Sequence, residues 1–224
     1  ISLTFTIPPR VIQPNWVHKS SKRKGGIVKK SLLMGCTLAL AASFSVAQTQ
    51  TKTDQASGLK LVLGMDIGDG GEKLASARYT DGSSDTIKSG GGVQFKVGVQ
   101  YPTSTNSSLL ATVGYEVDDT SAASNGSIKF QRFPVELLSM WRVGNKVRLG
   151  GGLRYASNPK LSGSGVASSL GTYSLKSKLG LVAQGEYLYS EKLGLTLRAI
   201  SEKFEYQGKS INANHVQLGV NYYH

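Results

Sequence analysis

Several features are scarce in this 224-residue sequence: cysteine, helical periodicity and the short motifs of enzymes. The single cysteine, Cys36, lies in an apolar run near the start, so the rest of the chain can form no disulfide and no cysteine-ligated metal site. No Walker loop, dinucleotide fingerprint or Cys/His metal spacing occurs, and the Gly-rich segments "SGGGVQF" and "LGGGLRY" each lead into a strand pattern instead of a helix. We therefore expect no catalytic residue, no cofactor and no metal ligand.

Acidic residues are absent from the first 47 positions, which hold seven of the 26 basic ones. Lys29 and Lys30 precede the run "SLLMGCTLALAASFSVAQ", which ends in small residues. A basic segment, an apolar segment and a small-x-small site predict a signal peptide at 29–47, cleaved after Ala47. The stretch from Leu33 to Cys36 resembles a lipoprotein-processing site, but few apolar residues precede Cys36 and the run continues well past it.

The two segments that flank this signal peptide have no steady periodicity. Residues 1–28 begin without Met, and we expect translation to start near Val28; an extended basic segment before the signal peptide is the alternative. Residues 48–57 are a polar segment. Removing 1–47 leaves 19 basic and 14 acidic residues, a formal charge of +5 in place of +12. The case for nucleic-acid binding thereby loses its main support.

Two-residue alternation of apolar and polar side chains recurs in eight runs within residues 58–224, and it predicts strands with two different faces. The expected strands are 58–68, 92–101, 108–118, 132–143, 146–155, 176–189, 192–206 and 215–224. Phe204 changes parity relative to Leu197, which predicts a β-bulge near Ser201. An even number of strands allows an antiparallel barrel to close, and the connections alternate between long and short. We predict one all-β domain, an eight-stranded antiparallel up-and-down transmembrane β-barrel.

The apolar face of nearly every expected strand is free of charge, whereas the other face mixes glycine with both charge signs. A lipid-facing Lys or Arg at mid-bilayer costs about 2–4 kcal/mol, so the charge-free face suits lipid. A narrow interior is filled by side chains, and buried charges require partners. We therefore predict lumen charges at Lys60, Asp66, Lys96, Glu116, Glu136, Arg142, Arg148, Arg154, Lys178, Glu186 and Arg198. A soluble periplasmic ligand-binding barrel, with the faces exchanged, is the alternative.

The last strand carries a polar residue, then glycine, then spaced aromatic residues: Gln217, Gly219 and Tyr222, with His224 at the end. In this and in its layout the chain resembles the small porin-like outer-membrane β-barrel family of the eight-stranded opacity type. The family usually ends in Phe where His224 stands. The resemblance implies export through the Sec signal peptide to the outer membrane of a Gram-negative bacterium, and it makes these four residues the barrel-assembly signal. It implies three kinds of partner: lipid, the assembly machinery and an unknown extracellular partner of the loops.

A structural, adhesive or narrow-pore role follows from that resemblance. One enzymatic alternative remains, because some outer-membrane barrels modify lipids with a Ser, a His and an acid at the rim. His215 could meet Ser201 or Glu202 there. The segment "DIGDGGE" clusters Asp66, Asp69 and Glu72 without the spacing of a calcium loop, which favours a strand end followed by a flexible loop.

Overall fold

A computed structural model describes residues 58–78, 84–122, 126–165 and 167–224. The segments expected at 1–28, 29–47 and 48–57, with the cleavage site at Ala47, lie outside the described residues. Within the described part, the one helix is a short 3-10 helix, η1 (Ser168–Leu170). No helix in these ranges is long and apolar enough to cross a membrane.

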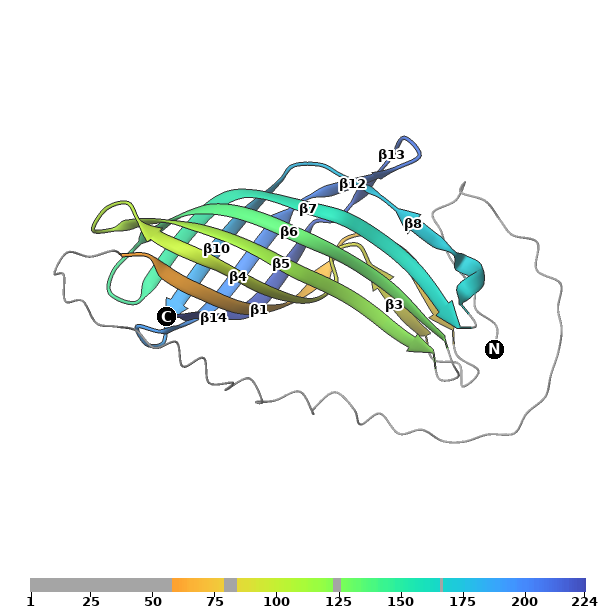
Figure 1. The fold of residues 1–224 in the computed structure, drawn as a ribbon, viewed down its shortest axis with the longest axis horizontal. Coiled ribbons are helices and arrows are strands. Elements are labelled where there is room, and N and C mark those ends of the chain that lie inside the picture. The colour runs from red at the N-terminus through yellow and green to blue at the C-terminus, as the bar shows by residue number, and fades with distance from the viewer. Residues whose placement is uncertain (1–57, 79–83, 123–125, 166) are drawn as a thin grey trace, which may run out of the picture. The chain divides into compact units, whose positions relative to one another are not determined.

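Eight strands form a closed antiparallel barrel, as the alternation predicts (Figure 1). They are β1 (Lys60–Gly70), β4 (Gly92–Pro102), β5 (Ser107–Ala122), β6 (Gly126–Arg142), β7 (Val147–Gly165), β10 (Gly180–Leu188), β11 (Leu193–Ser201) and β14 (His215–Tyr223). Each strand pairs with the next one in this series, and β14 pairs with β1 to close the ring. The prediction of an eight-stranded up-and-down barrel is confirmed.

The two ends of the barrel differ in their connections. Residues 103–106, 143–146 and 189–192 are tight turns at one end, the turn end, where the C-terminus also lies (Figure 1). Gly144 occupies the left-handed region there (φ 82°), which suits the residue without a Cβ. The backbone of His224 exchanges two hydrogen bonds with Leu61, at 2.9 and 3.0 Å. Pairing therefore continues to the last residue of the sequence.

At the opposite end, the loop end, strands continue where the alternation predicts loops. β5, β6 and β7 reach 16, 17 and 19 residues. Short strands accompany them: β2 (Lys73–Arg78), β3 (Ser84–Lys88), β8 (Thr172–Ser174), β9 (Lys176–Ser177), β12 (Lys203–Tyr206) and β13 (Lys209–Asn212). We call these short strands, with residues 118–122, 126–131 and 157–165 of the long ones, the extension.

The predicted bulge near Ser201 is wrong. Ile200 pairs with His215 between β11 and β14, and Lys203 pairs with Asn212 between β12 and β13. Both pairs belong to one unbroken register, and Ala213 N–H donates to the Glu202 carbonyl between them (3.0 Å). Phe204 is buried on the same side of the chain as Arg198. The parity does not slip; the interior itself changes from polar to apolar.

The barrel interior contains two apolar clusters separated by polar residues. One comprises Val62, Leu110, Leu138, Met140, Val182, Ile200 and Tyr223. The other lies in the extension and the residues that border it, and it comprises Leu74, Ala75, Ile87, Ile128, Phe130, Ala156, Leu161, Ala167, Leu170, Phe204, Ile211 and Ala213. Phe130 and Phe204 meet edge-to-face with centroids 5.8 Å apart, a favourable aromatic geometry. The extension therefore has a packed core of its own.

Candidate functional site

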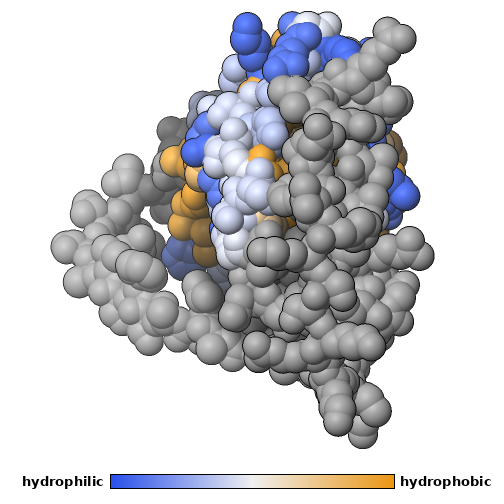
Figure 2. Space-filling model, turned by 90° about the vertical axis from the view of Figure 1, so that its right-hand side faces the viewer, coloured by the Kyte–Doolittle hydropathy of each residue, from blue (hydrophilic) through white to orange (hydrophobic). Residues whose placement is uncertain are grey.

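The outward face of the barrel is apolar. Its exposed large side chains include Leu61, Leu63, Ile67, Phe95, Val97, Val113, Phe133, Val135, Leu137, Leu149, Leu153, Tyr155, Leu195, Leu197, Val216 and Leu218. Leu197 is 59% exposed and Leu218 66% exposed. Viewed from the loop end, apolar surface lies along the sides of the barrel and mainly polar surface faces the viewer (Figure 2). A soluble protein rarely leaves so large a continuous apolar area uncovered.

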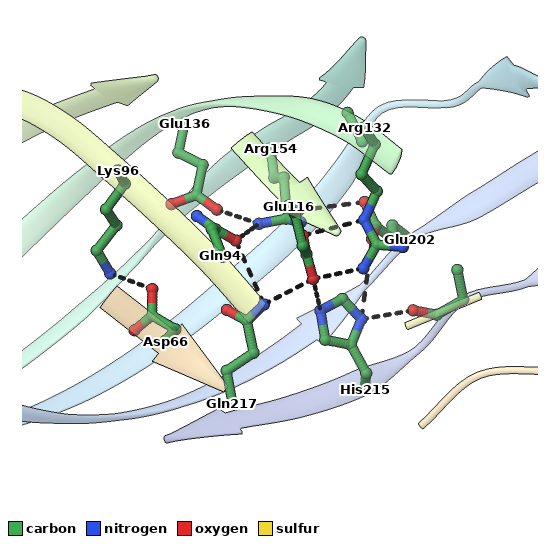
Figure 3. A network of polar contacts seen from close by, with 12 residues as sticks. Asp66, Gln94, Lys96, Glu116, Arg132, Glu136, Arg154, Glu202, His215 and Gln217 are labelled. Atoms are coloured by element: carbon green, nitrogen blue, oxygen red, sulfur yellow. Dashed lines mark hydrogen bonds and ion pairs between the residues drawn. The ribbon is translucent and has the colours of Figure 1, made fainter. Parts of the chain in front are cut away.

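The inward face is charged, and its charges are matched. Five cations and five carboxylates of the described residues are buried there in ion pairs: Lys96, Arg132, Arg148, Arg154 and Arg198 with Asp66, Glu116, Glu136, Glu186 and Glu202. Most of this network is drawn in Figure 3. Isolated buried ions are costly, but each of these cations contacts at least one carboxylate.

Arg154 on β7 is the centre of the network. It is completely buried and donates to carboxylates from three other strands or connections: Glu136 (2.5 Å), Glu202 (3.2 Å) and Glu116. It also donates to the Gln94 side-chain oxygen at 3.0 Å. The planar guanidinium has five N–H donors, so it can bridge several acceptors at once. One side chain thereby connects four acceptor residues that come from different parts of the chain.

Asp66 on β1 collects a second group of contacts. Its carboxylate accepts hydrogen bonds from Lys96 Nζ (2.6 Å), Thr196 Oγ1 (3.1 Å) and Arg198 (3.2 Å). Gly219 on β14 is opposite Asp66, and a Cβ at this position would collide with that carboxylate. Glycine at 219 therefore leaves the space that the buried carboxylate occupies.

A third group lies nearer the turn end. Arg148 donates to Glu186 at 2.6 Å and to the Gln100 side-chain oxygen at 3.0 Å. Tyr223 donates its hydroxyl proton to Glu186 (2.6 Å), while its ring lies 4.6 Å from the Arg148 guanidinium carbon. Asn221 also donates to Glu186, at 3.2 Å. The penultimate residue of the sequence thus helps to fill the lumen.

The structure separates the predicted lumen charges into two sets. Eight are buried in the interior: Asp66, Lys96, Glu116, Glu136, Arg148, Arg154, Glu186 and Arg198. Lys60, Arg142 and Lys178 are exposed, so their placement in the lumen is wrong. Lys60 begins β1 and Arg142 ends β6, both at the turn end, whereas Lys178 precedes β10 and pairs with Glu205 at 3.1 Å. Alternation alone does not show where the enclosed part of a strand stops.

Two buried charges of the interior, Arg132 and Glu202, were not among the predicted lumen charges. Arg132, the first residue of an expected strand, lies between Phe130 and Pro134 on the inward face and donates to Glu116 at 2.5 and 3.0 Å. Glu202 was missed because the predicted bulge near Ser201 left the direction of its side chain undefined, whereas the structure buries it in the interior. Interior residues that are not counted as charged in the sequence, such as Gln94 and His215, are not revealed by a charge pattern. His215 lies 3.8 Å from Glu202 and 3.9 Å from Glu116 (Figure 3).

The structure brings together only two of the three residues of the enzymatic alternative, His215 and Glu202, and it places Ser201 on the opposite face of its strand. His215 is buried in the lumen and its Nδ1 is 2.7 Å from the Ala213 carbonyl oxygen. Ser201 is exposed, and its hydroxyl donates to Asn214 at 3.2 Å. The acids of "DIGDGGE" also diverge: Asp66 faces the lumen, Asp69 pairs with Lys88 at 2.7 Å, and Glu72 accepts from the Asn212 backbone.

Polarity inverts along single strands where the barrel meets the extension. On β6 the outward side chains change from Val135 and Phe133 to Gln131 and Lys129, while the inward ones change from Glu136 and Arg132 to Phe130 and Ile128. The inversion passes through Arg132, whose guanidinium lies 5.2 Å from the Phe130 ring and 5.8 Å from the Phe204 ring. The barrel is apolar outside and polar inside; the extension is the reverse.

A closed sheet with an apolar band outside and matched charges inside is the architecture of a transmembrane β-barrel, because lipid offers no hydrogen-bond partners to open strand edges. No family model and no curated protein matches the sequence.

Solved outer-membrane proteins are similar to this chain in structure. One is the attachment invasion locus protein Ail of Yersinia pestis, solved in complex with the heparin analogue sucrose octasulfate. It is 14% identical to this chain with a TM-score of 0.48, and the match covers 74% of this chain and 97% of Ail. Neisserial surface protein A is 14% identical (TM-score 0.42; 74% and 97% covered). OprG of Pseudomonas aeruginosa is 12% identical (TM-score 0.37; 74% and 95% covered). Identities and scores this low specify no function.

Proposed function

We propose that the protein is an outer-membrane barrel of a Gram-negative bacterium whose lumen is closed and whose extension faces outward, in a structural or adhesive role. The observation that carries this proposal is the charge-matched network across the lumen. Around Arg154, three guanidinium groups and three carboxylates from β5, β6, β7, β11 and the β11–β12 junction form one network, and none of these side chains is exposed. A narrow pore is the second candidate, and it requires these ion pairs to part.

Conductance and gel mobility together test this proposal. The purified protein is expected to shift in mobility between unboiled and boiled samples in detergent, because a closed barrel stays folded until heated. Inserted into a planar lipid bilayer, it is expected to give no stepwise conductance. The variant Arg154→Ala, which opens the centre of the network, serves as the matched case in which steps are expected. Regular steps from the unaltered protein would establish the narrow pore instead.

A soluble periplasmic binding barrel is not supported. That alternative requires an apolar interior for a ligand and a polar exterior, and the barrel has the opposite arrangement. Recovery of the protein in the soluble periplasmic fraction, without a heat-dependent shift, would nevertheless overturn the membrane assignment.

We also propose that Gln217, Gly219, Tyr222 and His224 serve as the barrel-assembly signal, as the family resemblance implies. Tyr222 supports this role most directly, because its side chain is outward and exposed on β14. Gln217 and Gly219 face the lumen, where Gln217 donates to Glu116 at 3.1 Å. These two residues therefore also have a structural role inside the barrel. Replacing Tyr222 by Ala should slow assembly in cells while refolding of the purified chain in detergent proceeds normally. Equal effects in both settings would assign Tyr222 to stability alone.

Export through the Sec pathway with cleavage after Ala47 completes the proposal. Mass spectrometry of the protein purified from outer membranes is expected to find Gln48 at the N-terminus. A lipid-modified Cys36 at the N-terminus would support the lipoprotein alternative instead.

A further inference from the structure

Four lysines form a continuous row on the outward face of the extension. Lys160 on β7 is opposite Gln131 of β6, so Lys129 is its diagonal neighbour. On its other side Lys160 is opposite Ser174 of β8, which makes Lys176 the next diagonal neighbour. Lys176 is opposite Glu205 of β12, and Lys203 lies two residues from Glu205. Diagonal neighbours across a sheet lie roughly 7–8 Å apart, within reach of long side chains.

These four side chains, the lysine row, have little charge compensation of their own. None of them forms an ion pair with another described residue. Glu205 lies among them, but its carboxylate is bonded to Lys178 at 3.1 Å. Asp119 of β5 is opposite Lys129 and ends the row on that side. Lys176 and Lys203 are exposed, whereas Lys129 and Lys160 are half-buried. The row is therefore a concentration of positive charge open to a partner.

The row also has a fixed position above the apolar band. Lys129 lies four residues beyond Phe133 on the same face of the chain, and Lys203 lies four residues beyond Ala199. Four residues of extended strand span about 13 Å. The outward side chains of Phe133, Tyr155 and Leu179 below the row are 42%, 47% and 66% exposed. A ligand on this side of the barrel therefore meets ammonium groups at one level and an apolar wall directly beneath.

The row lies on one side of the barrel. On the other side the β2–β3 hairpin carries two further lysines, Lys73 and Lys88, and Lys88 is paired with Asp69 at 2.7 Å. The corresponding positions on the other side carry Asp69 on β1, Asp119 on β5 and the neutral Asn214 before β14. Attraction of anionic headgroups to the whole circumference would require cations on every strand. The longest run of neighbouring lysines therefore lies on one face, which spans β6, β7, β9 and β12.

We propose that the lysine row binds a phosphorylated lipid of the surrounding leaflet, with the lipid phosphates on the ammonium groups and its acyl chains on Phe133, Tyr155 and Leu179. Phosphate oxygens are strong acceptors for ammonium donors. Basic residues near a membrane surface also attract anionic lipids. The proposal rests on the membrane location proposed above. It assigns to the extension a specific partner in the membrane in addition to any partner beyond it.

Lipid titration of matched variants tests the row. The full-length protein in neutral phosphatidylcholine nanodiscs receives diphosphorylated lipid A or its dephosphorylated form, and native mass spectrometry counts the bound molecules. The row variant carries Lys→Gln at 129, 160, 176 and 203. The control variant removes four charges from the turn end by replacing Lys60, Arg142, Lys146 and Lys192 with Gln, all of which are exposed.

The row variant is expected to bind the diphosphorylated lipid on the order of 1,000-fold more weakly than the unaltered protein, while the control variant binds normally. Lys→Arg at the same four row positions should preserve binding. Equal loss in both Gln variants, full binding by the row variant, or equal binding of both lipid forms would overturn the proposal. Binding of inorganic phosphate alone with the same affinity would also overturn it, because the apolar wall would then contribute nothing.

The heat-dependent gel shift separates this result from a failure of the membrane assignment. A shift in all variants together with unchanged lipid binding by the row variant refutes the lysine row alone. Absence of the shift in the unaltered protein refutes the proposed function. Any lipid binding observed in that case would belong to a protein that is not a membrane barrel.

Discussion

The barrel and the extension are built from the same strands with opposite polarity. In the barrel, ion pairs fill the interior and apolar side chains cover the exterior; in the extension, a core of phenylalanine, leucine and isoleucine is covered by lysine, serine and asparagine. Side chains fill both interiors, but the barrel is filled by ion pairs and the extension by apolar packing. Packing tolerates substitutions that conserve volume, whereas a buried ion needs its own partner. The comparison teaches that the surroundings of a strand decide which side chains face inward.

The strongest break in this comparison should come from the charged interior. Arg154→Ala leaves Glu116, Glu136 and Glu202 without their shared cation, and we expect it to lower the free energy of unfolding by about 3–5 kcal/mol. Urea unfolding in lipid vesicles, followed by tryptophan fluorescence, measures the change. Arg142→Ala at the exposed end of β6 is the control and should change stability by no more than about 0.5 kcal/mol. Similar values for both variants would contradict the network.

Loss of packing in the extension should be comparably large but local. Phe204→Ala removes a fully buried ring that contacts Phe130, a change that costs about 3–5 kcal/mol in a well-packed core. We expect faster protease cleavage within the extension, whereas the heat-dependent gel shift of the barrel persists. Lys203→Ala, one residue away and outward, should leave cleavage unchanged. Loss of the gel shift in Phe204→Ala would mean that the two regions unfold together.

The inversion of polarity can be tested by placing the same residue on both sides of it. Val135→Arg and Gln131→Arg introduce the same side chain on the outward face of β6, below and above the inversion. The first should cost about 2–4 kcal/mol in a bilayer and the second about 0–1 kcal/mol. Urea unfolding in vesicles again measures both values. Equal costs would place the edge of the apolar layer elsewhere.

The smallest expected effect concerns one hydroxyl group in the lumen. Tyr223→Phe removes the donor that lies 2.6 Å from Glu186, and a lost bond to a buried charged group costs about 1–3 kcal/mol. Tyr222→Phe, at the outward-facing neighbour, should change the unfolding free energy by less than about 0.5 kcal/mol. A larger effect from Tyr222 than from Tyr223 would reverse the assignment of the two faces.

Alternation in the sequence is enough to predict the barrel, because its two faces differ sharply in polarity. The strand containing Leu61, Leu63 and Met65 illustrates this, since those side chains are exposed and Asp66 is buried as expected. The extension could not be predicted from the same rule. The same alternate positions point inward from Arg198 to Phe204, but the inward side chains change from polar to apolar. In the sequence this change is indistinguishable from a change of parity, which is why the sequence predicts a bulge near Ser201.

The candidate site was predictable in part for a related reason. Charge on the inward parity identifies Arg154 and Glu136, but only the three-dimensional arrangement shows that Arg154 reaches Glu202, 48 positions further along the chain. Lys60 and Arg142 share the parity of lumen residues yet are exposed, because the strands continue to the rim. The lysine row escapes sequence inspection altogether, since its members are neighbours only through the strand registers.

The inversion of polarity on β6 also fixes how deeply the barrel sits in the membrane. Sliding the barrel by two residues along its strands, about 7 Å, would expose Phe133 to water or bring Gln131 into hydrocarbon. Either displacement is penalised on every strand that carries the same transition. In a membrane of different thickness, the lipids around the barrel must therefore stretch or compress to match it, while the protein keeps its height.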